Sequence, residues 1–258
     1  MLAVMELNGT SAIVSGGASG LGEATARVLA AAGATVLVAD LNEERGKQIA
    51  DEIGGQFART DVSDEASVQA AVDAAVATGA PLRTAISCAG IGWASRTVGR
   101  DGTPHDLGAY QKVIAVNLVG TFNVMRIAAA AMADTEPDDD GQRGVVVNTA
   151  SIAAYEGQIG QAAYSAAKGG VIGMTLPAAR DLAAIGVRVV TIAPGTFLTP
   201  AMEGAPQPML ENFANMQPFP KRLGNPDEYA MLVEQIVDNP MINGETIRID
   251  GAVRFPPR

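Results

Sequence analysis

The chain has 258 residues, of which 48% are hydrophobic and 18% charged, which is enough apolar material for a large buried core and excludes a disordered chain. Its 18 basic and 28 acidic residues give a formal net charge of -10, the wrong sign for non-specific binding of nucleic acid. One cysteine and one histidine exclude an intrachain disulfide and a Cys- or His-rich metal site, so we expect no metal and a reducing, cytoplasmic environment.

Short β-branched runs alternate with longer segments of helical periodicity, which is typical of a parallel sheet covered by helices on both faces. Seven strands are predicted, at Ser11–Val14, Thr35–Ala39, Gln56–Arg59, Thr84–Ser87, Gly144–Asn148, Arg188–Ile192 and Thr246–Ile249. Helices are predicted at Leu21–Ala32, Glu43–Ile53, Glu65–Ala77, about Leu107–Met132 and about Gly160–Ala184. Asn42 and Asp64 are expected to be N-caps, and Pro177 is expected to kink or locally open the last helix.

Two long stretches lack this periodicity, Gly90–Asp106 and Pro194–Pro226. Loops of this length in a compact domain are usually functional, so we expect loops on the substrate side near residues 91–106 and 195–226. No uninterrupted apolar run approaches the roughly 18 residues of a membrane span, and residues 1–8 carry no targeting signal, so we expect no membrane partner.

A glycine-rich turn, Ser15–Gly22, follows the first strand and runs straight into a helix. Gly16, Gly20 and Gly22 allow a tight turn and a close approach of the backbone to a pyrophosphate, while the helix N-terminus offers free N–H groups. Such turns also occur as plain strand–helix connections. The order of the surrounding elements favours the dinucleotide interpretation.

Asp40 closes the second strand, about 20 residues beyond the glycine turn, where a carboxylate accepts both hydroxyls of an adenosine ribose. A 2'-phosphate at this place would meet a like charge, and no Lys or Arg in the turn or at position 41 offsets that repulsion. The sequence therefore predicts NAD rather than NADP. The alternative role for Asp40 is capping of the next helix.

Ends of two further strands extend the predicted nucleotide site. Asp61 and Val62 follow the third strand, where the adenine would lie, and small residues Cys88, Ala89 and Gly90 end the fourth. Cys88 is interpreted as a packing residue and not as a nucleophile.

Ser151, Tyr164 and Lys168 are the predicted catalytic residues. Residues four apart share one helix face, so the ammonium of Lys168 lies on the same side as the phenol of Tyr164. A neighbouring cation and an oxidised nicotinamide both favour the phenolate, which would bring its pKa toward neutrality. Ser151 could then hold the substrate oxygen while Tyr164 moves its proton. The alternative is a surface Tyr–Lys pair.

The chain resembles the short-chain dehydrogenase/reductase family over essentially its whole length. The motifs that carry this resemblance occur in the family's order: the glycine turn, Cys88-Ala89-Gly90, the Ser–Tyr–Lys set and Pro194-Gly195. The resemblance implies one Rossmann-fold domain over residues 1–258, with Asn117 placing a proton-relay water beside Ser151, Tyr164 and Lys168. It also places Phe197 and Thr199 near the nicotinamide. The full predicted cofactor set is Gly16, Ser19, Gly20, Leu21, Gly22, Asp40, Asp61, Val62, Cys88, Ala89, Gly90, Tyr164, Lys168, Pro194, Gly195, Phe197 and Thr199.

Several segments, including Gly120–Val124 and Arg222-Leu223-Gly224, resemble the type-2 3-hydroxyacyl-CoA dehydrogenase subgroup. This resemblance implies NAD-linked interconversion of 3-hydroxyacyl-CoA and 3-ketoacyl-CoA in fatty acid metabolism, and a homotetramer. Gln158 and Gln161 join Ser151 and Tyr164 as candidate substrate contacts, or they only tie down their loop. The alternatives are a hydroxysteroid or secondary-alcohol dehydrogenase and a non-catalytic binding subunit.

Overall fold

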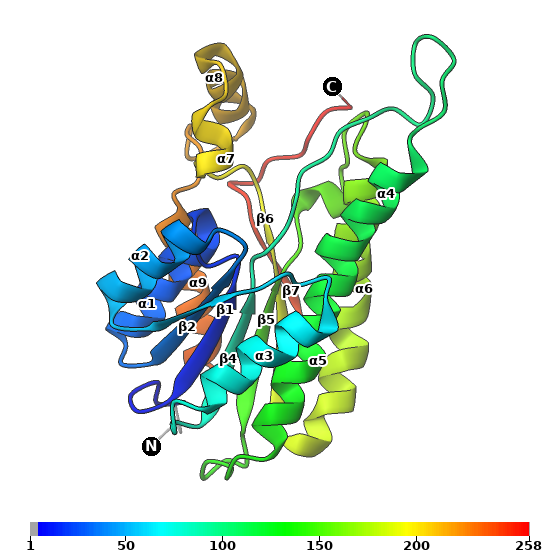
Figure 1. Ribbon diagram of the computed structural model, residues 1–258. Coiled ribbons are helices and arrows are strands. Elements are labelled where there is room, and N and C mark those ends of the chain that lie inside the picture. The colour runs from blue at the N-terminus through cyan, green and yellow to red at the C-terminus, as the bar shows by residue number, and fades with distance from the viewer. Residues whose placement is uncertain (1–4, 258) are drawn as a thin grey trace.

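Seven parallel strands form one sheet in the order β3-β2-β1-β4-β5-β6-β7 (Figure 1). The computed structural model describes residues 5–257, so residues 1–4 and 258 of the predicted domain lie outside the described part. The strands are β1 (Ser11–Ser15), β2 (Thr35–Asp40), β3 (Gln56–Arg59), β4 (Leu82–Ser87), β5 (Gly144–Thr149), β6 (Val187–Pro194) and β7 (Thr246–Ile249). All seven strand predictions are confirmed, with ends that differ by at most two residues.

Helices cover both faces of this sheet, as the alternating pattern predicted (Figure 1). One face carries α1 (Gly20–Ala31), α2 (Glu43–Ile53) and α9 (Pro226–Asp238), and the other carries α3 (Glu65–Val76), α5 (Gly120–Ala133) and α6 (Ala162–Leu182). Successive strand residues point to opposite faces, so Val14 packs in the first layer and its neighbour Ile13 in the second. The doubly wound architecture is therefore confirmed.

Two helix starts follow the capping rule that the sequence suggested. The side chain of Asn42 accepts a hydrogen bond from the Arg45 N–H at 3.1 Å, and that of Asp64 accepts one from the Ser67 N–H at 3.1 Å. Both N-cap predictions are confirmed, and these bonds fix where α2 and α3 leave the carboxyl edge of the sheet.

The predicted helix from about Leu107 to Met132 consists of α4 (Leu107–Ile114), the π-helical turn η1 (Ala115–Val119) and α5. By length and composition alone this stretch could cross a membrane, with a mean hydropathy of 1.6, although polar residues interrupt every apolar run. In the fold 56% of that apolar window is buried, and α5 packs on β4 and β5. Its apolar character is therefore that of a core helix.

The second long helix also agrees in position. α6 continues through Pro177 without ending there and passes into a 3-10 turn, η3 (Ala183–Ile185). The stretch 194–226, which we expected to be irregular, contains α7 (Pro200–Glu203) and α8 (Gln207–Met216), so that expectation was wrong. The sequence analysis missed α8 because Pro206 and Pro208 at its start are also typical of a loop, although Leu210, Phe213 and Met216 recur at helical spacing.

Candidate active site

The turn between β1 and α1 requires glycine at three positions for steric reasons. Gly16 and Gly20 have φ of 71° and 54°, a region that other residues rarely adopt. A Cβ on Gly16 would lie 2.6 Å from the Ala89 nitrogen, and one on Gly22 would lie 2.1 Å from the Gly16 oxygen. Ser19, the N-cap of α1, makes no side-chain capping bond, which leaves the first N–H groups of the helix available to a phosphate.

A cavity of about 630 Å³ opens beside this turn at the carboxyl edge of the sheet. Twelve predicted cofactor residues line it, namely Gly16, Ser19, Gly20, Leu21, Gly22, Asp40, Asp61, Val62, Cys88, Ala89, Gly90 and Thr199. The sequence analysis missed nine others, Ala39, Leu41, Thr60, Ser63, Ile91, Lys112, Ala115, Val116 and Pro200. Most of these flank predicted positions, and Lys112 reaches the cavity from α4, which the glycine and strand-end signals do not cover.

The carboxylate of Asp40 is held at the wall of the cavity by two backbone donors. One oxygen accepts from the Ala18 N–H of the glycine turn at 3.1 Å, and the other accepts from the Asn42 N–H at 2.9 Å. The second contact resembles the helix-capping alternative, while the first fixes the carboxylate beside the turn. Asp61 lies nearby, and hydrogen bonds from Ser63 hold the pKa of its carboxyl below the usual value.

Lys168 and Tyr164 share one face of α6, as their spacing predicted. The Lys168 ammonium is 5.8 Å from the centroid of the Tyr164 ring and donates a hydrogen bond to the Thr149 carbonyl at 2.7 Å. Lys168 is only 4% exposed, and burial lowers its pKa to about 8. The alternative of a surface Tyr–Lys pair does not fit this burial.

The pKa of Tyr164 is not lowered in the structure, contrary to the expectation from the sequence. With the protein groups alone, burial raises the pKa of its phenol, and the Ser151 hydroxyl only partly opposes this effect. The Lys168 ammonium points at the Thr149 carbonyl and not at the phenol oxygen, so its influence is weak. A protonated Tyr164 is suited to giving a proton to a substrate oxygen.

Ser151 follows β5 and begins a short 3-10 turn, η2 (Ile152–Ala154). Its hydroxyl oxygen accepts a hydrogen bond from the Ala153 N–H at 3.1 Å. Because that bond uses the oxygen as an acceptor, the hydroxyl proton can be donated to the Tyr164 phenol or to a substrate oxygen. This matches the role that the sequence suggested for Ser151.

Asn117 lies in the π-helical turn η1 and is fully buried. Its side-chain amide exchanges two hydrogen bonds with the backbone of Ile91, both 2.8 Å long. A Cβ on Gly90 would lie 3.0 Å from the Asn117 Oδ1 and 3.8 Å from the Lys168 Nζ. The catalytic residues thus adjoin the large cavity at Gly90, and the side chain of Asn117 holds that part of its wall.

Behind the site lies a contact that the sequence analysis missed. The phenol of Tyr229, a fully buried residue of α9, is 2.7 Å from the Thr149 hydroxyl and 3.7 Å from the Cys88 sulfur. Burial raises the pKa of the Cys88 thiol, which disfavours a thiolate nucleophile and agrees with a packing role. Nothing in the local sequence around Tyr229 indicates this long-range contact.

The two candidate substrate glutamines tie their own loop. The Gln161 Oε1 accepts from the Gln158 N–H at 2.9 Å, and the Gln158 amide donates to the Pro256 carbonyl at 3.3 Å. An open groove of about 390 Å³ runs past Gln158 to Arg96 and Pro257. Both glutamines therefore shape the loop between Ser151 and Tyr164.

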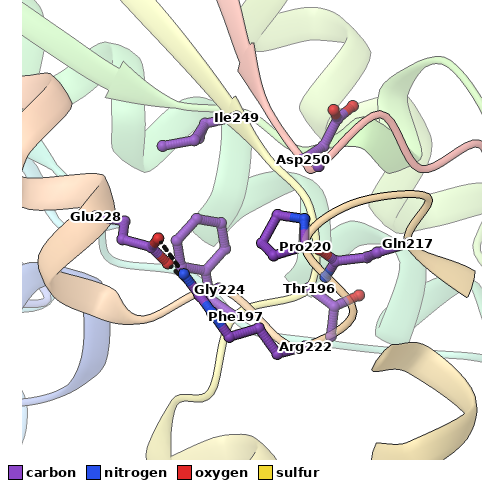
Figure 2. Close-up of a pocket in the computed structure, with 10 residues that line it drawn as sticks. Thr196, Phe197, Gln217, Pro220, Arg222, Gly224, Glu228, Ile249 and Asp250 are labelled. Atoms are coloured by element: carbon purple, nitrogen blue, oxygen red, sulfur yellow. Dashed lines mark hydrogen bonds and ion pairs between the residues drawn. The ribbon is translucent and has the colours of Figure 1, made fainter. Parts of the chain in front are cut away.

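Phe197 and Arg222 line a second, smaller cavity of about 140 Å³, as Figure 2 shows. Phe197 is 7% exposed, and a Cβ on Gly224 would lie 2.7 Å from its ring. Tyr164, Lys168, Pro194, Gly195 and Phe197 are the predicted cofactor residues that do not line the large cavity. Within residues 5–257, no group of three or more His, Cys, Asp or Glu side chains could hold a metal ion.

Residues 10–209 match the sequence model of the family described as short chain dehydrogenase. The chain belongs to the short-chain dehydrogenase family. Membership of this family implies a dehydrogenase that uses a nicotinamide cofactor.

Relatives of this short-chain dehydrogenase match it over nearly its full length. The Rattus norvegicus 3-hydroxyacyl-CoA dehydrogenase type-2 is 50% identical over 258 residues, covering 99% of each chain. The Drosophila melanogaster protein of the same name is 51% identical over 95% of this chain and 97% of its own. A crystal structure of 3-hydroxyacyl-CoA dehydrogenase type-2 from Mycobacterium avium has a TM-score of 0.95 and 53% identity, covering 99% of this chain and 100% of that one.

Proposed function

We propose that this short-chain dehydrogenase interconverts 3-hydroxyacyl-CoA and 3-ketoacyl-CoA with NAD(H) as the hydride carrier. The observation that carries the proposal is the buried Lys168 and the adjoining Tyr164 and Ser151 at the end of a nucleotide-sized cleft. Full-length similarity to the type-2 3-hydroxyacyl-CoA dehydrogenases supports this substrate class. The buried set argues against a non-catalytic binding subunit, because a buried cation is costly without a function.

The cleft fits a nicotinamide dinucleotide, because the uncapped N-terminus of α1 opens into it and offers free N–H groups to a pyrophosphate. A bound nicotinamide would supply the hydride acceptor for the alcohol or the hydride donor for the ketone. In reduction, Ser151 donates a hydrogen bond to the ketone oxygen and Tyr164 delivers the proton. In oxidation the phenolate form of Tyr164, which the positive charge of an oxidised nicotinamide would favour, takes the hydroxyl proton, while Lys168 stays anchored on the Thr149 carbonyl.

The test of the activity is NADH oxidation with acetoacetyl-CoA, run beside a 3-ketosteroid and a simple ketone. We expect kcat/KM to be highest for the thioester. If the steroid or the simple ketone is the better substrate, the alternative of a hydroxysteroid or secondary-alcohol dehydrogenase replaces the proposal. If none of the three is reduced, the proposal is wrong.

For the cofactor, Asp40→Arg is expected to reverse the preference from NADH to NADPH. The change removes a carboxylate that repels a 2'-phosphate and supplies a cation, which should change the ratio of kcat/KM values by about 100-fold. Glu44→Arg, an exposed change of equal charge on α2, is the matched control and should leave the ratio unchanged. A wild-type protein that already prefers NADPH would contradict the assignment of NAD.

For the thioester, Arg96→Glu with Arg100→Glu is expected to raise the KM for acetoacetyl-CoA about tenfold and to spare the KM for NADH. In a chain of net charge -10, an anionic CoA group needs local cations, and Arg96 lines the groove beside Gln158. Arg180→Glu, an exposed change near the far end of α6, measures the effect of one such charge reversal away from the groove. If the KM for acetoacetyl-CoA is equal in all variants, the CoA group does not bind at this groove.

We further propose a cytoplasmic homotetramer. Exposed apolar side chains on α5 and η1, Phe122 at 48% and Val119 at 50%, support an interface that includes the long helices. Of the small residues on α6, Gly173 is exposed, whereas Gly170 packs against Leu118. Light scattering after size-exclusion chromatography measures the assembly, and a monomer at working concentration would refute it.

A further inference from the structure

The loop Tyr155–Gln161 connects the two catalytic residues Ser151 and Tyr164, and its anchors come from elsewhere in the chain. Within the loop, the Gln161 side chain accepts a hydrogen bond from the Gln158 N–H. Further contacts reach β7, the residues after it and the 91–106 stretch. We call residues 250–257, which follow β7, the C-terminal strap.

Four charged side chains fasten the start of this loop to the strap. Arg248 of β7 binds both oxygens of Glu156, at 2.8 and 2.9 Å, and its Nε donates to Asp250 at 2.7 Å. Arg254 completes the cluster with a 3.1 Å bond to the same Asp250 oxygen. The side chains of Arg248, Glu156 and Asp250 are 21%, 23% and 8% exposed, so solvent screens this cluster much less than surface pairs.

The guanidinium of Arg248 also lies 4.9 Å from the centroid of the Tyr155 ring, which adds a cation–π contact at the first residue of the loop. Figure 2 shows that the carboxylate of Asp250 points away from the small cavity, and it accepts hydrogen bonds from Arg248, Arg254 and the Ala252 N–H. Asp250 thus serves the ionic cluster and does not contribute its charge to that cavity.

The far end of the strap holds the middle of the loop through its backbone. The Ile159 N–H donates to the Pro257 carbonyl at 3.0 Å, and the Gln158 amide reaches the Pro256 carbonyl. The Gly160 carbonyl in turn accepts from the Ser95 N–H at 2.8 Å, so the 91–106 stretch is attached to the same loop. Each of these segments borders the groove that contains Arg96.

The strap also contacts the helical part of the 195–226 stretch. Phe255 packs against Phe213 of α8 with ring centroids 6.1 Å apart. In Figure 1 the strap, drawn in red, crosses the top of the sheet between α8 and the 91–106 stretch. Two segments of the substrate side, the loop and α8, therefore meet the strap directly, and the 91–106 stretch is attached to it through the loop. No strap residue lines the cofactor cavity.

We propose that the C-terminal strap positions the substrate side of the active site, with Arg248 as the positioning residue that fixes the loop between Ser151 and Tyr164. It acts through Glu156 and the loop backbone, and it sets the fit of the substrate independently of the nucleotide. The inference rests on the proposed function for the choice of assay substrate. It deepens that function by naming what determines substrate fit.

The kinetic test uses Arg248→Gln, Glu156→Gln, and a chain that ends after Arg254. We expect each change to raise the KM for acetoacetyl-CoA about fivefold or more, because small displacements of a positioning loop weaken substrate binding strongly. The KM for NADH should stay within about twofold of wild type, since the strap does not touch that cavity. Arg27→Gln, which breaks ion pairs to Glu23 and Glu52 on the opposite side of the sheet, is the matched control.

Two further measurements test the same contact: a charge-swap variant that should restore it, and hydrogen exchange, which needs no substrate. The double variant Arg248→Glu with Glu156→Arg should recover part of the lost substrate affinity. Arg248→Lys keeps the charge but loses the two-pronged guanidinium, so its substrate affinity should lie between those of wild type and Arg248→Gln. Hydrogen exchange at residues 155–161 should be about tenfold faster in the variants and unchanged in α1.

An unchanged KM for the thioester in Arg248→Gln, or an equal rise of both KM values, would overturn the inference. Unchanged exchange in the loop would overturn it as well. If the wild-type protein reduces no ketoacyl thioester, the proposed function fails, while the exchange measurement still decides whether the strap holds the loop.

Discussion

Tyr164→Phe is expected to lower kcat for ketoacyl reduction roughly 1,000-fold or more, which is the usual contribution of a positioned general acid. The substitution removes the phenol oxygen. That oxygen lies next to Ser151 and is placed to give up a proton, because burial keeps the phenol protonated. Binding of NADH should persist because Tyr164 does not line the large cavity. Steady-state kcat and the fluorescence titration of NADH measure the two effects separately.

Tyr110→Phe is the matched control for this change. Tyr110 also packs beside Val113 and Ala163 in the small apolar cluster that contains Tyr164, but its ring faces His105. Its loss of a hydroxyl should change kcat less than about threefold. A Tyr164→Phe enzyme that keeps more than about a tenth of wild-type kcat would remove Tyr164 from the proton-transfer role.

The strands and crossover helices could be predicted because burial on both faces leaves a direct mark on the sequence. β5 is buried along its whole length, and its run of valines is visible as such. α8 was missed although Leu210, Phe213 and Met216 recur at helical spacing. Its N-cap Pro206 and its second residue Pro208 are typical of a loop as much as of a helix start.

Some parts of the candidate site could likewise be predicted from the sequence, and others could not. The glycine turn and the Tyr164–Lys168 spacing are local patterns; the structure places the turn in the wall of the cleft and Lys168 next to that wall at Gly90. Contacts between distant segments, such as Tyr229 with Thr149 or Arg248 with Glu156, depend on chain folding and have no local signature. The direction of the Tyr164 pKa was also beyond the sequence, because it depends on where the Lys168 ammonium points.

The buried ammonium of Lys168 lowers the stability of the fold but is placed to serve the reaction. Its ammonium is almost completely buried, and the structure supplies it with one carbonyl, that of Thr149. A pKa of about 8 in place of 10.5 means that the charged form costs on the order of 3 kcal/mol at neutral pH, at 1.36 kcal/mol per unit. The cation is retained at this cost because it is held beside both Tyr164 and the cavity wall at Gly90.

Lys168→Met is therefore expected to abolish measurable reduction and yet to raise the free energy of unfolding by roughly 2 kcal/mol at neutral pH, the charge cost less a lost hydrogen bond. In the wild type, the unfolded chain binds more protons than the folded one between pH 8 and 10.5, so stability rises with pH there. The variant lacks that slope, and its advantage shrinks across the window. Urea unfolding at several pH values measures this, with Lys47→Met on the surface as control. A variant less stable than wild type at neutral pH would show that the ammonium stabilises the fold.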